Sequence, residues 1–178
     1  MKTYIALFRG INVGGRNTLP MRELVALLEG LGCEAVQTYI QSGNAVFRSG
    51  EQDAPHLAAK ISAAIYENHG FQPDVHLLTT DQLERAAASN PFADAESDPS
   101  GLHLVFLATP VKSPDTFAIE NLRAENERVA VATDVAFLHA PDGIGRSRLA
   151  AGLERALGVA ATGRNWRTVQ KILEMARR

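Results

Sequence analysis

The order in which strand-like and helix-like patterns follow one another most limits how this chain of 178 residues can fold. Within residues 4–78 the patterns are a strand, an amphipathic helix, two strands joined by the tip at 41–44, a second helix and a fourth strand. This is the β-α-β-β-α-β order of a ferredoxin-like unit. Residues 102–162 show the same order without a clear repeat of sequence. We therefore expect an α+β fold of two ferredoxin-like lobes with mainly antiparallel sheets, plus a connector helix and a C-terminal helix.

Capping residues, glycine and proline mark the expected helix ends. An apolar stripe starting at Met21 predicts the first helix, with Thr18 as its N-cap. The second helix is expected to open after Asp53 and to close at Gly70. The connector helix should end before Pro91, because a residue that precedes proline avoids the α region.

A polar segment separates the two expected lobes. Residues 93–101 contain Pro99 and Gly101 and few large apolar side chains, which is typical of a linker. We expect an N-terminal lobe with its connector helix over 1–92 and a C-terminal α+β lobe over 101–178, together forming a single compact module.

Composition indicates the cellular compartment and excludes several kinds of site. Apolar residues make up 46% of the chain and charged residues 21%, close to the average of soluble globular proteins. The lone cysteine, Cys33, allows neither an internal disulfide nor a multi-cysteine zinc site, so we expect a reducing, cytoplasmic setting. The sequence has no apolar run of about 18 residues, so no membrane-spanning helix and no membrane partner are expected. It suggests no metal cluster and no cofactor either.

The stretch from Arg9 to Asn17, RGINVGGRN, follows the first strand and is rich in glycine. It nearly matches the phosphate-binding P-loop, but Arg16 stands where that motif has lysine, and Asn17 where it has serine or threonine. The next helix also starts several residues too late, so a P-loop nucleoside triphosphatase is not expected. Glycines let a chain turn tightly, which explains the glycines but not the arginines and asparagines among them.

Topology predicts where these polar residues lie. In a β-α-β-β-α-β sheet the first two strands run the same way, so the loop after strand one and the tip between the strands expected at 36–40 and 45–48 share one edge. Their side chains suit hydrogen bonding to phosphate, carboxylate or a nucleobase edge. An equally weighted interpretation is that they brace the two loops against each other. The candidate ligand-binding residues here are Arg9, Asn12, Arg16, Gln41, Ser42 and Asn44.

The C-terminal part of the chain is basic. Formal net charge is −2 overall, yet residues 146–178 carry +6 and the remainder −8. The basic residues either pair with acidic groups within the fold or form an anion-binding surface. After a last strand expected at 159–162, Arg164 stands beside a helix N-terminus that Asn165 can cap, and such a position favours anions. Arg164 and Asn165 therefore join the candidate ligand-binding residues, whereas Trp166 is either a core residue or a stacking platform.

Five segments resemble a known family when taken together. They are FRGINVGG at 8–15, PM at 20–21, TYIQSGNAVF at 38–47, NPF at 90–92 and TGRNWRTVQKIL at 162–173. In this order they are similar to bacterial domain-of-unknown-function family sixteen ninety-seven. The resemblance implies a two-lobed α+β fold with a ferredoxin-like N-terminal part in a soluble bacterial protein. It implies no reaction, and the loops that carry its motifs are those singled out above by their chemistry.

Two functions remain open at this point. The favoured one is binding of a small anionic ligand or nucleotide, with Arg9 and Arg164 holding the charge and the amide and hydroxyl side chains orienting the ligand. The alternative is a nucleic-acid or protein interaction module that uses the basic C-terminal third. Aromatic residues are only 6% of the chain, and no aromatic strand signature of RNA-binding sheets is present. The sequence names no catalytic residue and no oligomeric state.

Overall fold

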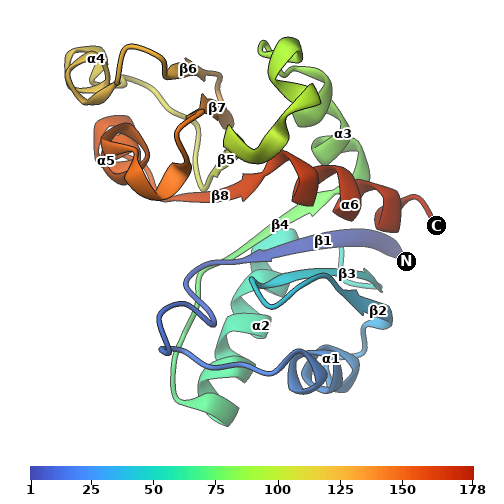
Figure 1. The fold of residues 1–178 in the computed structure, drawn as a ribbon. Coiled ribbons are helices and arrows are strands. Elements are labelled where there is room, and N and C mark those ends of the chain that lie inside the picture. Colours follow the sequence, from blue (N-terminus) through green and yellow to red (C-terminus); the bar gives the residue numbers. More distant parts are fainter. The chain divides into compact units, whose positions relative to one another are not determined.

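The computed structural model describes residues 1–178 as two α+β units (Figure 1). The first unit comprises Met1–Glu84 and Lys171–Arg178, and the second comprises Arg85–Gln170. Each unit holds a four-stranded antiparallel sheet in which the element order is β-α-β-β-α-β. The expected fold class, two ferredoxin-like lobes with additional helices, is confirmed.

In the first unit the strand order is β2-β3-β1-β4, so β3 separates two strands that run in the same direction. Both helices between the strands lie on one face of this sheet, where their leucine and isoleucine side chains pack against Tyr4, Phe8 and Phe47 (Figure 1). The elements up to the connector helix are β1 (Lys2–Phe8), α1 (Met21–Gly30), β2 (Glu34–Thr38), β3 (Asn44–Ser49), α2 (Ala54–His69), β4 (Val75–Thr79) and α3 (Thr80–Ala88).

The second unit repeats this arrangement with the strand order β6-β7-β5-β8. Its α4 and α5 pack on one sheet face, against a core that includes Leu107, Ala136 and Leu138. Its elements, with the final helix that continues into the first unit, are the short 3-10 helices η1 (Ala93–Ser97) and η2 (Pro99–Gly101), then β5 (Leu102–Leu107), α4 (Thr116–Leu122), β6 (Arg128–Val131), β7 (Val135–His139), η3 (Ile144–Arg146), α5 (Arg148–Leu157), β8 (Ala161–Asn165) and α6 (Trp166–Ala176).

Two expected helix signals in the first unit are confirmed and one is wrong. The Asp53 carboxylate caps α2 by accepting a hydrogen bond from the His56 N–H at 3.0 Å, and Gly70 ends the helix with φ +75°. Thr18 does not cap α1: the position before the helix is Pro20, and no side chain bonds to the first turn. The proline itself fixes φ at −59°, which starts the helix without a side-chain cap.

Two strands lie away from their expected positions because sheet pairing outweighs the local apolar pattern. The strand expected at 36–40 is β2, which begins at Glu34 and contains a bulge around Ala35, whose φ is +51°. The strand expected at 159–162 is β8, which continues through Asn165 because its last residues pair with β5. The polar segment expected as a linker, 93–101, forms η1 and η2.

Candidate functional site

The loop after β1 and the tip between β2 and β3 meet, as their topology predicts. We call residues 9–19 and 39–44 together the loop edge. The Phe8 N–H donates to the Gly43 carbonyl at 2.8 Å, and Asn12 Nδ2 donates to the Gln41 carbonyl at 2.9 Å. Five sequence-predicted site residues of the first unit therefore lie within two bonded loops, and Arg16 follows on the same loop.

The glycines of this loop form a tight two-residue turn. Gly14 and Gly15 have φ +59° and +72°, and the Arg16 N–H donates to the Val13 carbonyl at 3.1 Å. Positive φ at both central positions is the signature of a type I′ hairpin turn. Because α1 begins only at Met21, the turn does not place a helix N-terminus against a phosphate as a P-loop does. The glycines thus turn a corner, and any ligand contact must come from other groups.

Asn12 and Asn44 use their side-chain amides to brace the loops. Asn12 Oδ1 accepts from the Leu19 N–H at 2.8 Å, and its Nδ2 donates to the Leu19 carbonyl at 2.9 Å as well as to Gln41. Asn44 is fully buried, and its Nδ2 donates to the Tyr39 carbonyl at 3.1 Å and to Ser42 Oγ at 3.0 Å. These two candidates therefore support the site's shape.

The backbone of the loop edge is unusually constrained. Of the nine residues from Arg9 to Asn17, five have positive φ: Gly10, Asn12, Gly14, Gly15 and Asn17. Ile40 also has φ +49°, which is an outlier for a β-branched residue. At the non-glycine residues Asn12, Asn17 and Ile40 such conformations cost about 1–3 kcal/mol each, and they persist where surrounding contacts hold them, commonly at functional sites.

Two arginines and two apolar side chains face outward from this scaffold. Arg9 Nη1 lies 3.7 Å from Asp74 Oδ2, and the Arg9 side chain is 39% exposed. Arg16 is exposed, and its guanidinium has no hydrogen bond or ion pair within the chain. Val13 is 64% exposed and Ile40 is 51% exposed. The loop edge thus offers positive charge beside apolar surface.

Arg164 and Asn165 lie in the second unit, within β8. Arg164 lies just before α6, as expected, but it also belongs to β8 and pairs in register with Leu104 of β5, because β8 is longer than the sequence pattern indicated. The register places it on the sheet face opposite α4 and α5. Its Nη1 donates to the Gly163 carbonyl at 2.8 Å, and burial lowers the pKa of its guanidinium to about 10.

Asn165 joins η2 to β8 and caps α6. Its Nδ2 donates to the Pro99 carbonyl at 2.7 Å, with longer contacts to the carbonyls of Ser100 and Leu102. Its Oδ1 accepts from the Arg167 N–H at 3.0 Å, which is the N-cap role expected of it. Trp166 is 6% exposed, which fits a core residue.

The basic residues of the C-terminal part are divided between pairing and exposure. Lys171 Nζ lies 2.9 Å from Glu174 Oε2, Arg178 also pairs with Glu174, and Arg177 Nε lies 2.8 Å from Glu84 Oε1. Internal pairing therefore accounts for part of the charge asymmetry. The arginines that are exposed and have no ion-pair partner within the chain are Arg146, Arg148, Arg155 and Arg167.

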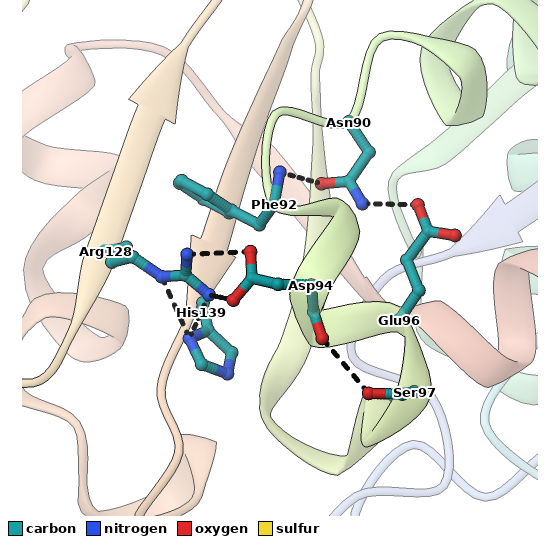
Figure 2. Close-up of polar contacts among 7 residues, drawn as sticks. All are labelled: Asn90, Phe92, Asp94, Glu96, Ser97, Arg128 and His139. Carbon is teal, nitrogen blue, oxygen red and sulfur yellow. Dashed lines mark hydrogen bonds and ion pairs between the residues drawn. The ribbon is translucent and has the colours of Figure 1, made fainter.

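A polar cluster in the second unit was not foreseen from the sequence (Figure 2). The Arg128 guanidinium binds both carboxylate oxygens of Asp94, at 3.0 and 2.8 Å, and lies 4.7 Å from the centre of the Phe92 ring. Its Nε donates to His139 Nδ1 at 3.3 Å. Asn90 Oδ1 accepts from the Phe92 N–H at 3.1 Å. The Asn-Pro-Phe segment signals a turn, but nothing in the sequence links it to a residue more than 30 positions away.

The environment of this cluster shifts the pKa values of two of its side chains. The Arg128 side chain holds the pKa of Asp94 below its usual value of 3.8. Burial, and then the nearby Arg128 charge, lower the pKa of His139 from 6.5. The cluster fixes η1 to the hairpin of β6 and β7, and its groups are occupied with one another. We therefore interpret it as a structural clamp.

His139 predicts how the clamp responds to pH. A histidine whose pKa is lower in the folded chain binds its proton less readily there than in the unfolded chain. Its contribution to stability is therefore complete above pH 6.5 and is lost as the pH falls from there through the lower folded value. We expect the urea midpoint of the wild-type chain to fall between pH 7.5 and pH 5.5, and to fall less in His139→Gln.

The control for this experiment is His56→Gln, at an exposed position on α2. Burial also lowers the pKa of His103, so a residual decrease of the same sign is expected in every variant. An undiminished pH dependence in His139→Gln, with the dependence of His56→Gln equally unchanged, would contradict the assignment.

The structure contains no cluster of metal ligands, no membrane-spanning helix and no exposed cysteine. No group of three or more His, Cys, Asp or Glu side chains is placed to hold a metal ion. None of the helices has the length and apolar character that crossing a membrane requires. Cys33 is 4% exposed, and burial raises the pKa of its thiol, which makes it an unreactive core cysteine.

The chain is similar to a solved structure entitled "The structure of conserved bacterial protein SP0830 from Streptococcus pneumoniae", with 26% identity and a TM-score of 0.77 over 100% of this chain and 99% of that chain. No curated protein matches the chain. The family model described as "Protein of unknown function (DUF1697)" matches residues 1–137, which include the loop edge and the residues of the clamp other than His139. The chain therefore belongs to the DUF1697 family.

Proposed function

We propose that the loop edge binds a small organic anion, with Arg16 as its main charged contact. The observation that carries the proposal is an exposed guanidinium without a partner, held on a turn whose own position is fixed by hydrogen bonds. The amide N–H groups of Gly14 and Gly15 also have no acceptor within the chain. Guanidinium and backbone N–H groups are the common donors to phosphate and carboxylate oxygens.

Rigidity of the loop edge supports binding as well as shape. Affinity is reduced when a loop must become ordered on binding, so a loop fixed in advance binds more tightly. Asn12 fixes this loop through Leu19 and Gln41, and Asn17 Nδ2 adds a bond to the Gly10 carbonyl at 3.0 Å. The two expected roles of the polar residues, bracing and binding, are thus assigned to different members of the set.

The exposed apolar residues suggest which anions fit. Val13 and Ile40 adjoin the Asn12–Gln41 bond on either side, so an apolar or aromatic part of a ligand can pack there while its charged group reaches Arg16. Arg9, Gln41 and Ser42 supply the remaining polar contacts. A nucleotide or an aryl phosphate combines both features, whereas inorganic phosphate has only the charge.

Removal of the Arg16 side chain is the direct test. We expect Arg16→Ala to weaken binding at least about tenfold, because a charge-assisted hydrogen bond contributes about 1.5–3 kcal/mol. Thermal-shift measurements at low salt with inorganic phosphate, nucleoside phosphates, sugar phosphates and aryl carboxylates would show which class binds. Isothermal titration of the best ligand would then compare the variants.

The matched control is Arg22→Ala, which removes another exposed arginine of the first unit that has no partner within the chain. Its affinity should equal that of the wild type. Equal losses in the two variants would indicate general electrostatic attraction, and unchanged affinity in Arg16→Ala would refute the assignment. Short RNA in the same panel examines the alternative interaction module, which has less support because several basic residues of the C-terminal part are already paired.

A further inference from the structure

A groove between α4 and α5 in the second unit lies outside the loop edge. Its volume is about 420 Å³, which falls in the range of small-molecule sites. The floor is apolar and is formed by Ala118, Leu122, Ala151 and Ala156. Gly152 lets the two helices approach closely, because a Cβ atom added there would lie only 2.5 Å from Leu122 Cδ1.

Two arginines of α5 line this groove without acidic partners. Arg148 and Arg155 are seven positions apart, so they lie two turns apart on one side of the helix, separated by about 10 Å along its axis. Both are exposed, and neither guanidinium makes an ion pair or hydrogen bond within the chain. The one acidic residue of the groove, Asp115, already accepts a hydrogen bond from the Ala118 N–H at 2.9 Å.

Helix stability does not explain Arg148. It occupies the first turn of α5, where the helix dipole favours acidic side chains, and that turn contains none. The α5 N-cap is supplied by Ser147, whose Oγ accepts from the Ala150 N–H at 2.9 Å. Arg148 therefore places a positive charge at the unfavourable end of the helix dipole and beside an apolar groove. An anion bound from outside the chain would offset this unfavourable interaction.

We infer that the α4–α5 groove is a second binding site, which takes a small anion with an apolar body, such as an aryl phosphate or a fatty carboxylate. The anionic group lies between or against Arg148 and Arg155, and the apolar body covers the alanine and leucine floor. An inorganic anion leaves that floor unfilled, so it binds more weakly than an organic one. This inference uses different residues from the loop edge and does not depend on it.

Backbone amide NMR of the full chain tests the groove with three defined probes: phenyl phosphate, octanoate and inorganic phosphate. We expect phenyl phosphate or octanoate to shift the amide signals of Ala118, Ala151 and Ala156. Inorganic phosphate should bind with an affinity at least about tenfold lower in the same titration. Absence of shifts in the groove with both organic probes would overturn the inference, as would equal affinity for inorganic phosphate.

Two variants test separately how the arginine charges and the open volume of the groove contribute to ligand affinity. Arg148→Gln combined with Arg155→Gln should lower the affinity at least about tenfold through lost charge-assisted contacts. Ala151→Phe should abolish binding by filling the groove from an exposed helix position, with the fold checked by circular dichroism. Arg146→Gln, at an exposed arginine outside the groove, should leave the affinity unchanged. Retained affinity in both groove variants would overturn the site, and Arg16→Ala should not affect it.

Discussion

Replacing Gly43 with alanine is expected to lower the free energy of unfolding by about 3 kcal/mol. Gly43 has φ +78°, a conformation that costs an L-residue about 1–2 kcal/mol. A Cβ atom there would also lie 2.8 Å from both Phe8 Cβ and Ile11 Cδ1. Because Phe8 and Ile11 are each only 1% exposed, the contact cannot be relieved toward solvent, and overpacking of this kind costs about 1–3 kcal/mol.

Gly14 is the matched control for this measurement. It has a similar positive φ of +59°, but an added Cβ would meet no atom within 4 Å. Gly14→Ala should therefore lose only the conformational part, about 1–2 kcal/mol. Urea unfolding of the two variants beside the wild type gives both values. Equal losses would mean that the close packing of Gly43 against Phe8 and Ile11 contributes nothing.

Asn12→Ala is expected to lose about 3 kcal/mol as well, through hydrogen bonds. The variant removes three bonds of 2.8–2.9 Å, two to the backbone of Leu19 and one to the Gln41 carbonyl. Each contributes about 1 kcal/mol, and a buried group left without its partner costs more. Leu19 is fully buried, so water does not readily replace the lost amide.

Two further substitutions separate the causes. Asn12→Gly loses the same hydrogen bonds but tolerates the native φ of +53°, so it should be more stable than Asn12→Ala by about 1 kcal/mol. Asn17→Ala removes a single exposed hydrogen bond, to the Gly10 carbonyl, at a similar φ of +50°, and should therefore lose less than Asn12→Ala. If Asn12→Ala weakened ligand binding while leaving the unfolding curve unchanged, Asn12 would be a ligand contact and the bracing role would be wrong.

The fold was predictable because its signals are periodic and ordered. Apolar spacing distinguishes strands from helices, and the order of elements selects the ferredoxin-like topology. That topology in turn places Asn12 beside Gln41, although they are 29 positions apart. Asp53 and Gly70, the ends of α2, follow local rules of capping, which explains why they were identified correctly.

Other features depend on tertiary contacts that no local rule contains. β8 extends through Asn165 only because β5 offers it a partner. Positive φ at Ala35 and Ile40 contradicts the preferences of those residue types, so neither the bulge nor the strained tip could be foreseen. The same holds for the pairing of Arg128 with Asp94, which depends on where η1 packs. The sequence therefore identified the residues of the loop edge but not which of them brace it.

The residues of the Val13–Arg16 turn, which we propose contact the ligand, are distinct from the residues that stabilise the fold of the loop. Hydrogen bonds of Asn12, Asn17 and Leu19 anchor the loop below the turn, and the space around Gly14 and Gly15 is open. Residues at the turn can therefore be exchanged, lengthened or grafted without strain on the core. This is the same division of labour that lets antibody loops diversify on a constant framework. A library randomised at Val13 and Arg16 alone would thus explore ligand choice on one unchanged scaffold.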